Sequence, residues 1–311
     1  MSRLGVAVRG RLVEPYRLAL DRYRTRPPTG GDSEIVTQVH RGDVRAFDVI
    51  VERHWAAVAA YLCTCTADLE SVDDLTERTF SHAFVEAAQG AAPTFPWRVH
   101  LLATARGLVL REWVHRPVGP FLPGFRRWAS AGGAWPLNCR PHLAEAYRTL
   151  PESRQAVLWH SIVEGDISGS ATACLGARRG DFDRLASRAR VALRESYLEL
   201  RQRAAVLSVE CTKYSALLAA AVAGGPTDPD AERGRADECI ADHLAVCGRC
   251  REVYGDLADL DEQVRTQLPP LLLGWWPGPE YHRLRASQSP PGRPLAFLRE
   301  AAARAAASAS G

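Results

Sequence analysis

The stretch SVDDLTERTFSHAF, residues 71–84, carries the hydrophobic spacing of an amphipathic helix. Its acidic residues Asp73, Asp74 and Glu77 fall on one side of such a helix. Positions three or four apart share a helical face, and the opposite face collects the less polar side chains. These are Val72, Leu75, Thr79, Phe80, Ala83 and Phe84. Because the same period recurs from Asp32 to about Arg116 with few strand signals, the sequence predicts an all-α fold.

The composition is that of an ordinary soluble globular protein, with 46% hydrophobic and 24% charged residues in a chain of 311. A transmembrane helix needs a run of about 18 to 20 apolar residues, and the sequence has no such run. Its N-terminus lacks the uninterrupted apolar core and the cleavage site of a signal peptide. We therefore expect a cytoplasmic protein with no membrane partner. Since the net charge is only +3, any affinity for nucleic acid has to come from local patches.

Changes in composition divide the chain into successive segments. They are a basic arm (1–31), a first helical block (32–116), a linker dense in Pro and Gly (117–141), a second helical block (142–203), a small cysteine-rich helical segment (209–262) and a Pro- and Ala-rich tail (263–311). Within the tail, Trp275 and Trp276 leave two interpretations open: a docking segment, or a linker that packs on itself.

The second helical block has the pattern of a helix-turn-helix. Two helices are predicted on either side of a short turn around Gly176. The last helix has a buried stripe of Phe182, Leu185, Ala189, Leu193, Tyr197 and Leu200. Arg184, Arg188, Arg190 and Arg194 lie largely outside that stripe. Such a helix either enters the major groove of DNA or forms a solvated surface, and the period alone allows both.

Two longer stretches of this block carry a family resemblance. They are LAEAYRTLPESRQAVLWHSIVEGDIS (143–168) and CLGARRGDFDRLASRARVALRE (174–195), which resemble the promoter-binding domain four of extracytoplasmic-function (ECF) sigma factors. The stretch EIVTQVHRGDVRAFDVIVERHWAAVAAYL (34–62), together with residues 71–84, is similar to domain two of that family. The resemblance implies a sigma factor that binds core RNA polymerase and directs it to promoter DNA. It assigns polymerase binding to Asp73, Asp74, Leu75, Glu77 and Phe80.

The same resemblance implies two sets of DNA contacts. One comprises Trp97, Arg98 and Arg106 in the strand-opening segment, and the other comprises Arg178, Arg179, Arg184 and Arg188 around the recognition helix. The sequence departs from the family pattern at His100, where tryptophan is usual, and at Gly107, where asparagine is usual. Asp181 and Asp183 stand where threonine and lysine are usual. These departures keep a second hypothesis open, in which a sigma-derived protein binds polymerase or another sigma factor without reading promoters.

The stretch HLAVCGRC, residues 243–250, supplies three ligands of a zinc site, His243, Cys247 and Cys250. Zinc takes four Cys or His ligands in a tetrahedron, so one more is needed. Cys239 lies one helical turn before His243, whereas Cys211 could reach the cluster from a partner helix. Three ligands in a row along one helix fit a tetrahedron less well, so we expect structural Zn²⁺ bound by Cys211, His243, Cys247 and Cys250. Unmetallated buried thiols are the alternative.

The cysteine-rich segment also resembles a known family. CTKYSALLAAAV (211–222) and ADHLAVCGRCREVYGDL (241–257) are similar to the zinc-binding anti-sigma (ZAS) domain. This implies an intramolecular, anti-sigma-type contact that modulates the sigma domains, and we hypothesise that it covers the face of Asp73, Asp74 and Glu77. Cys239 could take part in redox release of the metal. A zinc site with four protein ligands leaves no open position for substrate, and no other catalytic arrangement has supporting context, so we expect no enzyme activity.

Overall fold

The computed structural model describes residues 30–91, 93, 95–133, 141–166, 169–203, 211, 214, 218, 222 and 231–288. Over these residues the chain is helical and contains no β-strand, as the sequence predicts. The contacts between residues divide the chain into two units. The first lies within 1–135, 168–179 and 272–311, and the second within 136–167 and 180–271.

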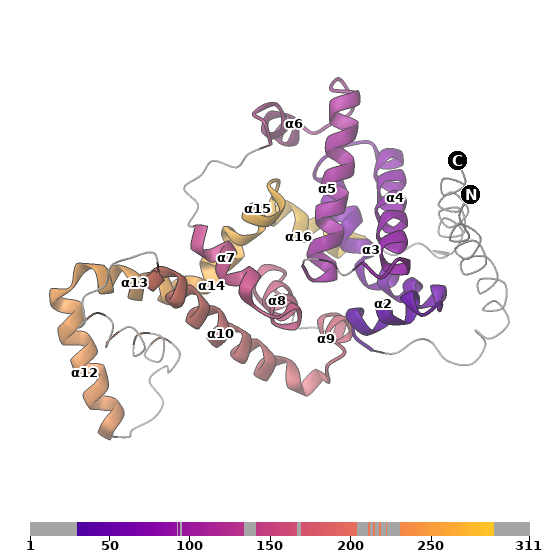
Figure 1. The fold of residues 1–311 in the computed structure, drawn as a ribbon. Helices are drawn as coiled ribbons and strands as arrows, with labels where there is room; N and C mark the ends of the chain where they lie inside the picture. Colours follow the sequence, from indigo (N-terminus) through magenta and orange to yellow (C-terminus); the bar gives the residue numbers. More distant parts are fainter. Residues whose placement is uncertain are drawn as a thin grey trace, which may run out of the picture. The chain divides into compact units, whose positions relative to one another are not determined.

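The first unit is built mainly from helices that follow one another in the chain (Figure 1). They are α2 (Asp32–His40), η1 (Val44–Ala46), α3 (Phe47–Cys63), α4 (Leu69–Ala88), α5 (Trp97–His115) and α6 (Pro123–Ser130). Two later helices, α9 (Gly169–Leu175) and α16 (Gly278–Ser287), belong to the same unit. Helix α3 packs against α4, α5 and α16. The core of this unit is therefore completed by residues from the end of the described chain.

Helix α4 contains the stretch that predicted the fold. It begins after Asp68, whose carboxylate accepts the Ser71 backbone N–H at 3.3 Å and so satisfies one free donor of the first turn. The predicted apolar face is buried: Val72, Leu75, Thr79, Phe80, Ala83 and Phe84 are at most 3% exposed. The ring of Phe80 stacks on Trp55 of α3, with centroids 5.7 Å apart. Burial of this face against α3 and α5 accounts for the position of α4.

Two features of the first unit differ from the predicted order of segments. Residues 123–130 form helix α6, although the surrounding 117–141 has the composition of a linker. Helix α6 buries Phe125 and Trp128, so its aromatic side chains supply the apolar face that the Pro and Gly content conceals. Helix α9, predicted as part of the second block, packs on α2. The chain thus leaves the first unit and returns to it more than once.

The second unit contains the remaining helices. They are α7 (Pro141–Thr149), α8 (Glu152–Leu158), the π-helical turn η2 (Trp159–Val163), α10 (Phe182–Arg203), α12 (Ala231–Val246), α13 (Gly248–Ala258) and α14 (Leu260–Thr266). The short helices η3 (Arg179–Asp181) and α15 (Leu268–Leu273) span the points where the chain changes unit. Helix α10 packs on α7 and α8, and α14 packs on η2. The predicted stripe of α10 is confirmed for Phe182, Ala189, Leu193, Tyr197 and Leu200, which are buried.

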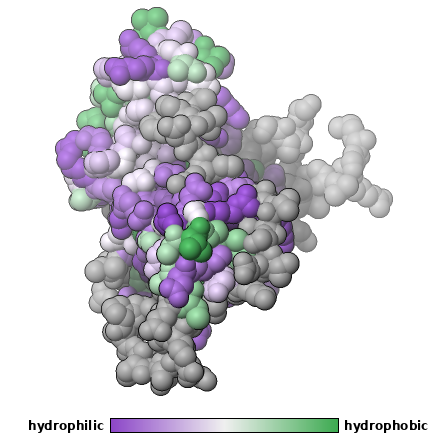
Figure 2. Space-filling model, turned by 90° about the vertical axis from the view of Figure 1, so that its left-hand side faces the viewer, coloured by the Kyte–Doolittle hydropathy of each residue, from purple (hydrophilic) through white to green (hydrophobic). Residues whose placement is uncertain are grey.

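Large hydrophobic side chains are exposed singly among the described residues. They are Leu69, Val114, Val118, Val191 and Val246. Figure 2 shows one face of the molecule, on which hydrophilic residues predominate and hydrophobic ones form small separate patches. Among the helices that the structure describes, none combines the length and the apolar character needed to cross a bilayer.

Candidate functional site

The metal-ligand cluster forms where α12 meets α13 at a corner (Figure 1). His243 lies in the last turn of α12. Cys247 stands between the helices in an extended conformation, with φ −102° and ψ 98°, and Cys250 follows in the first turn of α13. The Arg251 guanidinium donates to the carbonyls of Leu244 and Ala245, at 2.9 and 2.7 Å. This cap on the end of α12 holds the corner that places the ligands.

The structure brings all four predicted ligands together. The ligand atoms of Cys211, His243, Cys247 and Cys250 lie within 4.8 Å of one another. The two sulfurs of Cys211 and Cys247 are 3.8 Å apart, and His243 Nε2 is 3.2 Å from Cys250 Sγ. A tetrahedral zinc ion with Zn–S bonds of about 2.3 Å separates two sulfurs by about 3.8 Å. Three thiolates and one imidazole could therefore hold a metal ion here, and this donor set suits zinc.

Cys239 is not part of the cluster. Its side chain is exposed on α12, so the structure selects Cys211 as the fourth member. The ring of Tyr214 stacks on the imidazole of His243, with centroids 4.2 Å apart and 13° between the planes. This contact orients the imidazole toward the sulfurs. Sequence reasoning missed Tyr214, because one aromatic residue on an apolar helix gives no distinct signal.

The two cysteines of the CGRC turn differ in acidity. Burial, together with the neighbouring Cys247 and Cys211, raises the pKa of the Cys250 thiol to about 12. Hydrogen bonds, first from the backbone N–H of Cys250, lower the pKa of Cys247. A divalent cation between them would favour both thiolates, because it offsets the charge that burial disfavours.

The segment that follows the ligands is bound to α10 through two aspartates. Asp256 of α13 accepts from the Tyr197 hydroxyl at 3.3 Å and pairs with Arg201 at 3.5 Å. Asp261 of α14 pairs with Arg190 at 2.6 Å. The sequence placed Arg190 outside the buried stripe but contained no signal for its partner Asp261, which lies 71 positions away.

The residues assigned to polymerase binding divide by exposure. Asp73, Asp74 and Glu77 are exposed on α4, whereas Leu75 and Phe80 are at most 2% exposed. Arg78 bridges Asp74 and Glu112 of α5, at 3.0 and 2.8 Å. A pocket at this end of α4 is lined by Asp68, Glu70, Asp74, Arg78, Glu112 and Arg116, among others. The exposed part of the predicted site is therefore an acidic surface.

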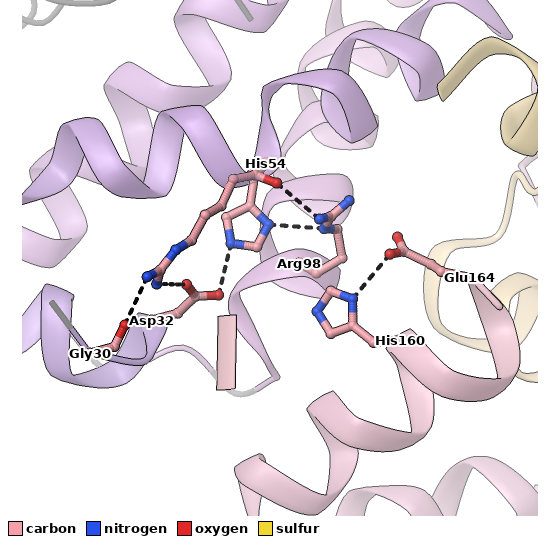
Figure 3. A network of polar contacts seen from close by, with 7 residues as sticks. Gly30, Asp32, His54, Arg98, His160 and Glu164 are labelled. Atoms are coloured by element: carbon pink, nitrogen blue, oxygen red, sulfur yellow. Dashed lines mark hydrogen bonds and ion pairs between the residues drawn. The ribbon is translucent and has the colours of Figure 1, made fainter. Parts of the chain in front are cut away.

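The strand-opening set is mostly inside the fold. Trp97 and Arg98 are 2% and 3% exposed. The Arg98 Nε–H donates to His54 Nδ1 at 2.9 Å, so His54 Nε2 carries the proton and donates to Asp32 at 2.8 Å (Figure 3). Burial raises the pKa of Asp32, but the interactions with His54 and Arg53 outweigh it and lower the pKa below its usual range.

The other candidate DNA contacts lie at several places. Arg106 is half-buried and donates to the Leu273 carbonyl at 3.2 Å. Arg178 is exposed and belongs, like Arg179, to the first unit. Arg184 and Arg188 are exposed on α10 in the second unit. At two positions that depart from the family pattern, Asp181 pairs with Arg184 at 2.7 Å and His100 pairs with Glu86 at 2.8 Å.

Two further clusters have metal-ligand chemistry. They are Asp32, His54 and Cys174 in the first unit, and His160, Glu164 and Asp166 in the second. Both nitrogens of His54 are engaged within the protein, and the adjacent Arg98 is cationic, which disfavours a metal ion. In the second cluster the Glu164 carboxylate already accepts from Trp159 and interacts with His160, as Figure 3 shows for the histidine. Neither cluster was expected from the sequence. Asp32, His54 and Cys174 lie far apart in the chain, and the spacing of four between His160 and Glu164 is equally that of an ion pair along one helix.

Comparisons of the chain with protein-family models, with curated proteins and with solved structures find no match.

Proposed function

We propose that this protein is an ECF-type sigma factor, which binds core RNA polymerase and directs it to promoter DNA, and whose activity a fused zinc-binding segment modulates. The observation that carries the proposal is the division of α4 into a buried apolar face and an exposed acidic face of Asp73, Asp74 and Glu77. The buried face attaches the helix to its own unit. The acidic face is exposed to solvent, where its charge favours contact with a basic partner surface.

DNA recognition in this proposal rests on α10. Arg184 and Arg188 are exposed along a helix whose opposite face is buried against α7 and α8. Guanidinium groups in this position can contact phosphates and guanine edges in the major groove. Trp97 and Arg98 are buried, so they are not among the DNA contacts that we propose.

In this proposal, zinc has a structural role. With four protein ligands it would hold the corner between α12 and α13, and it would leave no position for substrate. The contacts of Asp256 and Asp261 with α10 support a modulation that acts on the recognition helix.

The alternative is a sigma-derived protein that binds polymerase or another sigma factor without reading promoters. Two observations favour it. Arg98 is committed to His54, and His100 to Glu86, so neither side chain is presented for strand opening. Asp181 forms an ion pair with Arg184 at the start of the recognition helix, so this guanidinium already has an acidic partner.

Binding to reconstituted polymerase tests the shared part of both hypotheses. We expect the double variant Asp73→Ala, Glu77→Ala to bind core polymerase roughly tenfold more weakly, a loss of about 1.4 kcal/mol. The control Glu34→Ala, Glu52→Ala removes the same charge from exposed positions of α2 and α3. Equal affinity of the two double variants would contradict polymerase docking on α4.

Run-off transcription on genomic fragments separates the two hypotheses. Specific initiation by the reconstituted holoenzyme supports the sigma factor. Polymerase binding without initiation at any fragment supports the alternative.

A further inference from the structure

A tight turn near the end of the described chain packs against α3, α5 and α6 of the same unit. Leu273 and Trp275 flank Gly274, whose φ is +72°, and the Trp275 N–H donates to the Leu273 carbonyl at 2.9 Å. Glycine is required at the centre because L side chains rarely adopt this φ. A Cβ on Gly274 would also lie 2.9 Å from Cζ2 of Trp128. The turn therefore depends on a residue without a side chain.

Polar groups of α3 and α5, and of Thr64 directly after α3, hold the backbone and indole of this turn. Arg106 of α5 donates to the Leu273 carbonyl at 3.2 Å. The buried Tyr61 hydroxyl of α3 donates to the Trp275 carbonyl at 3.1 Å. The Trp275 indole N–H donates to Thr64 Oγ1 at 3.1 Å, and its ring packs against Phe125 and Trp128 of α6. Of the two interpretations of the tail, Trp275 favours a docking segment, whereas Trp276 packs on Tyr281 and His282 of the tail itself.

Two buried donors in this region are unsatisfied by the described part of the chain. Neither Arg106 Nε nor Trp128 Nε1 has a hydrogen-bond partner among the residues that the structure describes. Both side chains contact the turn, Arg106 through the Leu273 carbonyl and Trp128 at Gly274. An unpaired buried donor destabilises the fold, because it has lost its hydrogen bonds to water. The Arg106 guanidinium therefore has hydrogen-bonding capacity that one peptide carbonyl does not fill, and a phosphate group has several acceptor oxygens to which it can donate.

We infer that the turn Leu273–Trp276 is an autoinhibitory plug, which competes with a phosphodiester of single-stranded nucleic acid for Arg106. The inference rests on the proposed function, because Arg106 belongs to the set that the family resemblance assigns to DNA. When the turn is docked, the Leu273 carbonyl occupies the guanidinium. When the turn leaves, the Arg106 guanidinium loses the Leu273 carbonyl and can donate to a phosphate oxygen instead. Helix α16, packed on α3, keeps the released turn close to its site.

The test uses the full-length chain with Gly274→Ala, which opposes the turn by both backbone strain and contact with Trp128. The control is Gly255→Ala in α13, where a Cβ meets no atom within 4 Å. A labelled single-stranded oligonucleotide serves as probe in fluorescence anisotropy. Hydrogen exchange of residues 273–288 reports release of the segment separately. We expect Gly274→Ala to exchange faster and to bind the probe about fivefold or more tighter than the wild type, and Gly255→Ala to match the wild type.

Adding Arg106→Gln to Gly274→Ala should cancel the gain in probe affinity and lower its salt dependence by about one phosphate contact. Faster exchange without tighter probe binding would overturn the plug. Unchanged exchange in both Gly274→Ala and Trp275→Ala would overturn it as well, since the segment would then be a permanent part of the fold. Polymerase binding is tested with the α4 variants and does not depend on the turn. If the proposed function is wrong, the polymerase-binding assay fails, while the hydrogen exchange of residues 273–288 still reports whether the turn is released.

Discussion

Arg190 of α10 and Asp261 of α14 form an ion pair, with Arg190 Nε and the carboxylate 2.6 Å apart. Arg194 lies 4.0 Å from the other oxygen of the same carboxylate. The helix assigned to DNA recognition is thereby joined to the segment that follows the metal ligands. A change in the position of α14 would alter this contact with α10. The coupling free energy of the ion pair measures how strongly the two helices are linked.

A double-mutant cycle with Arg190→Ala and Asp261→Ala should give a coupling free energy of about 0.5 to 1 kcal/mol, because both side chains are only partly exposed. The pair Arg203 and Glu199 has a similar separation, 2.6 Å, but its side chains are 69% and 62% exposed. As an exposed (i, i+4) pair within one helix, it should couple by no more than about 0.3 to 0.5 kcal/mol. Urea unfolding of the zinc-loaded chain measures both cycles. Equal couplings would mean that the contact of α14 with α10 contributes no specific stability.

The purified chain should bind zinc with one ion at the four-ligand cluster. Cys211→Ser should lower zinc affinity by about tenfold or more, since it removes one of four ligands. Cys239→Ser is the matched control, as Cys239 is exposed and outside the cluster. Competition with a chromophoric chelator gives both affinities. If Cys239→Ser weakened zinc binding as much as Cys211→Ser, the ligand assignment would be wrong.

Asp32→Asn should destabilise the first unit by about 2 kcal/mol at pH 7, because the variant removes a buried charged acceptor from Arg53 and His54. The pKa of Asp32 is lowered in the folded state, so its stabilisation is present above the unfolded pKa and is lost as the pH falls through the folded pKa. The wild type and variant should therefore converge in acid. Urea unfolding at several pH values checks this, and a difference that does not depend on pH would argue against a charged Asp32.

Gly176→Ala should destabilise the chain more than Gly165→Ala. Both glycines have positive φ, +63° and +59°, which costs an alanine about 1 to 2 kcal/mol. A Cβ on Gly176 would also lie 2.5 Å from the backbone nitrogen of Gly31, whereas a Cβ on Gly165 meets no atom within 4 Å. Thermal unfolding of the two variants isolates the contact between α9 and the start of α2. Equal losses would show that this contact is not made in solution.

The all-α class, the buried face of α4 and most of the stripe of α10 were predictable from the sequence, because the period of apolar residues reports the buried face of a helix directly. The four-ligand cluster was predictable for a different reason. Few residue types bind zinc, and tetrahedral geometry limits how they are spaced, so Cys211 could be preferred to Cys239 before any contact was known.

Other features were decided only by tertiary structure. The period shows that a face is apolar but not which other face it meets, so the packing of α9 on α2 and of α16 on α3 could not be read from it. Exposure of a polar side chain has the same origin, which is why Arg98 is enclosed beside His54 while Arg184 faces solvent. The partners Asp261 and Leu273 lie far along the chain from Arg190 and Arg106, and only folding brings these groups within hydrogen-bond distance.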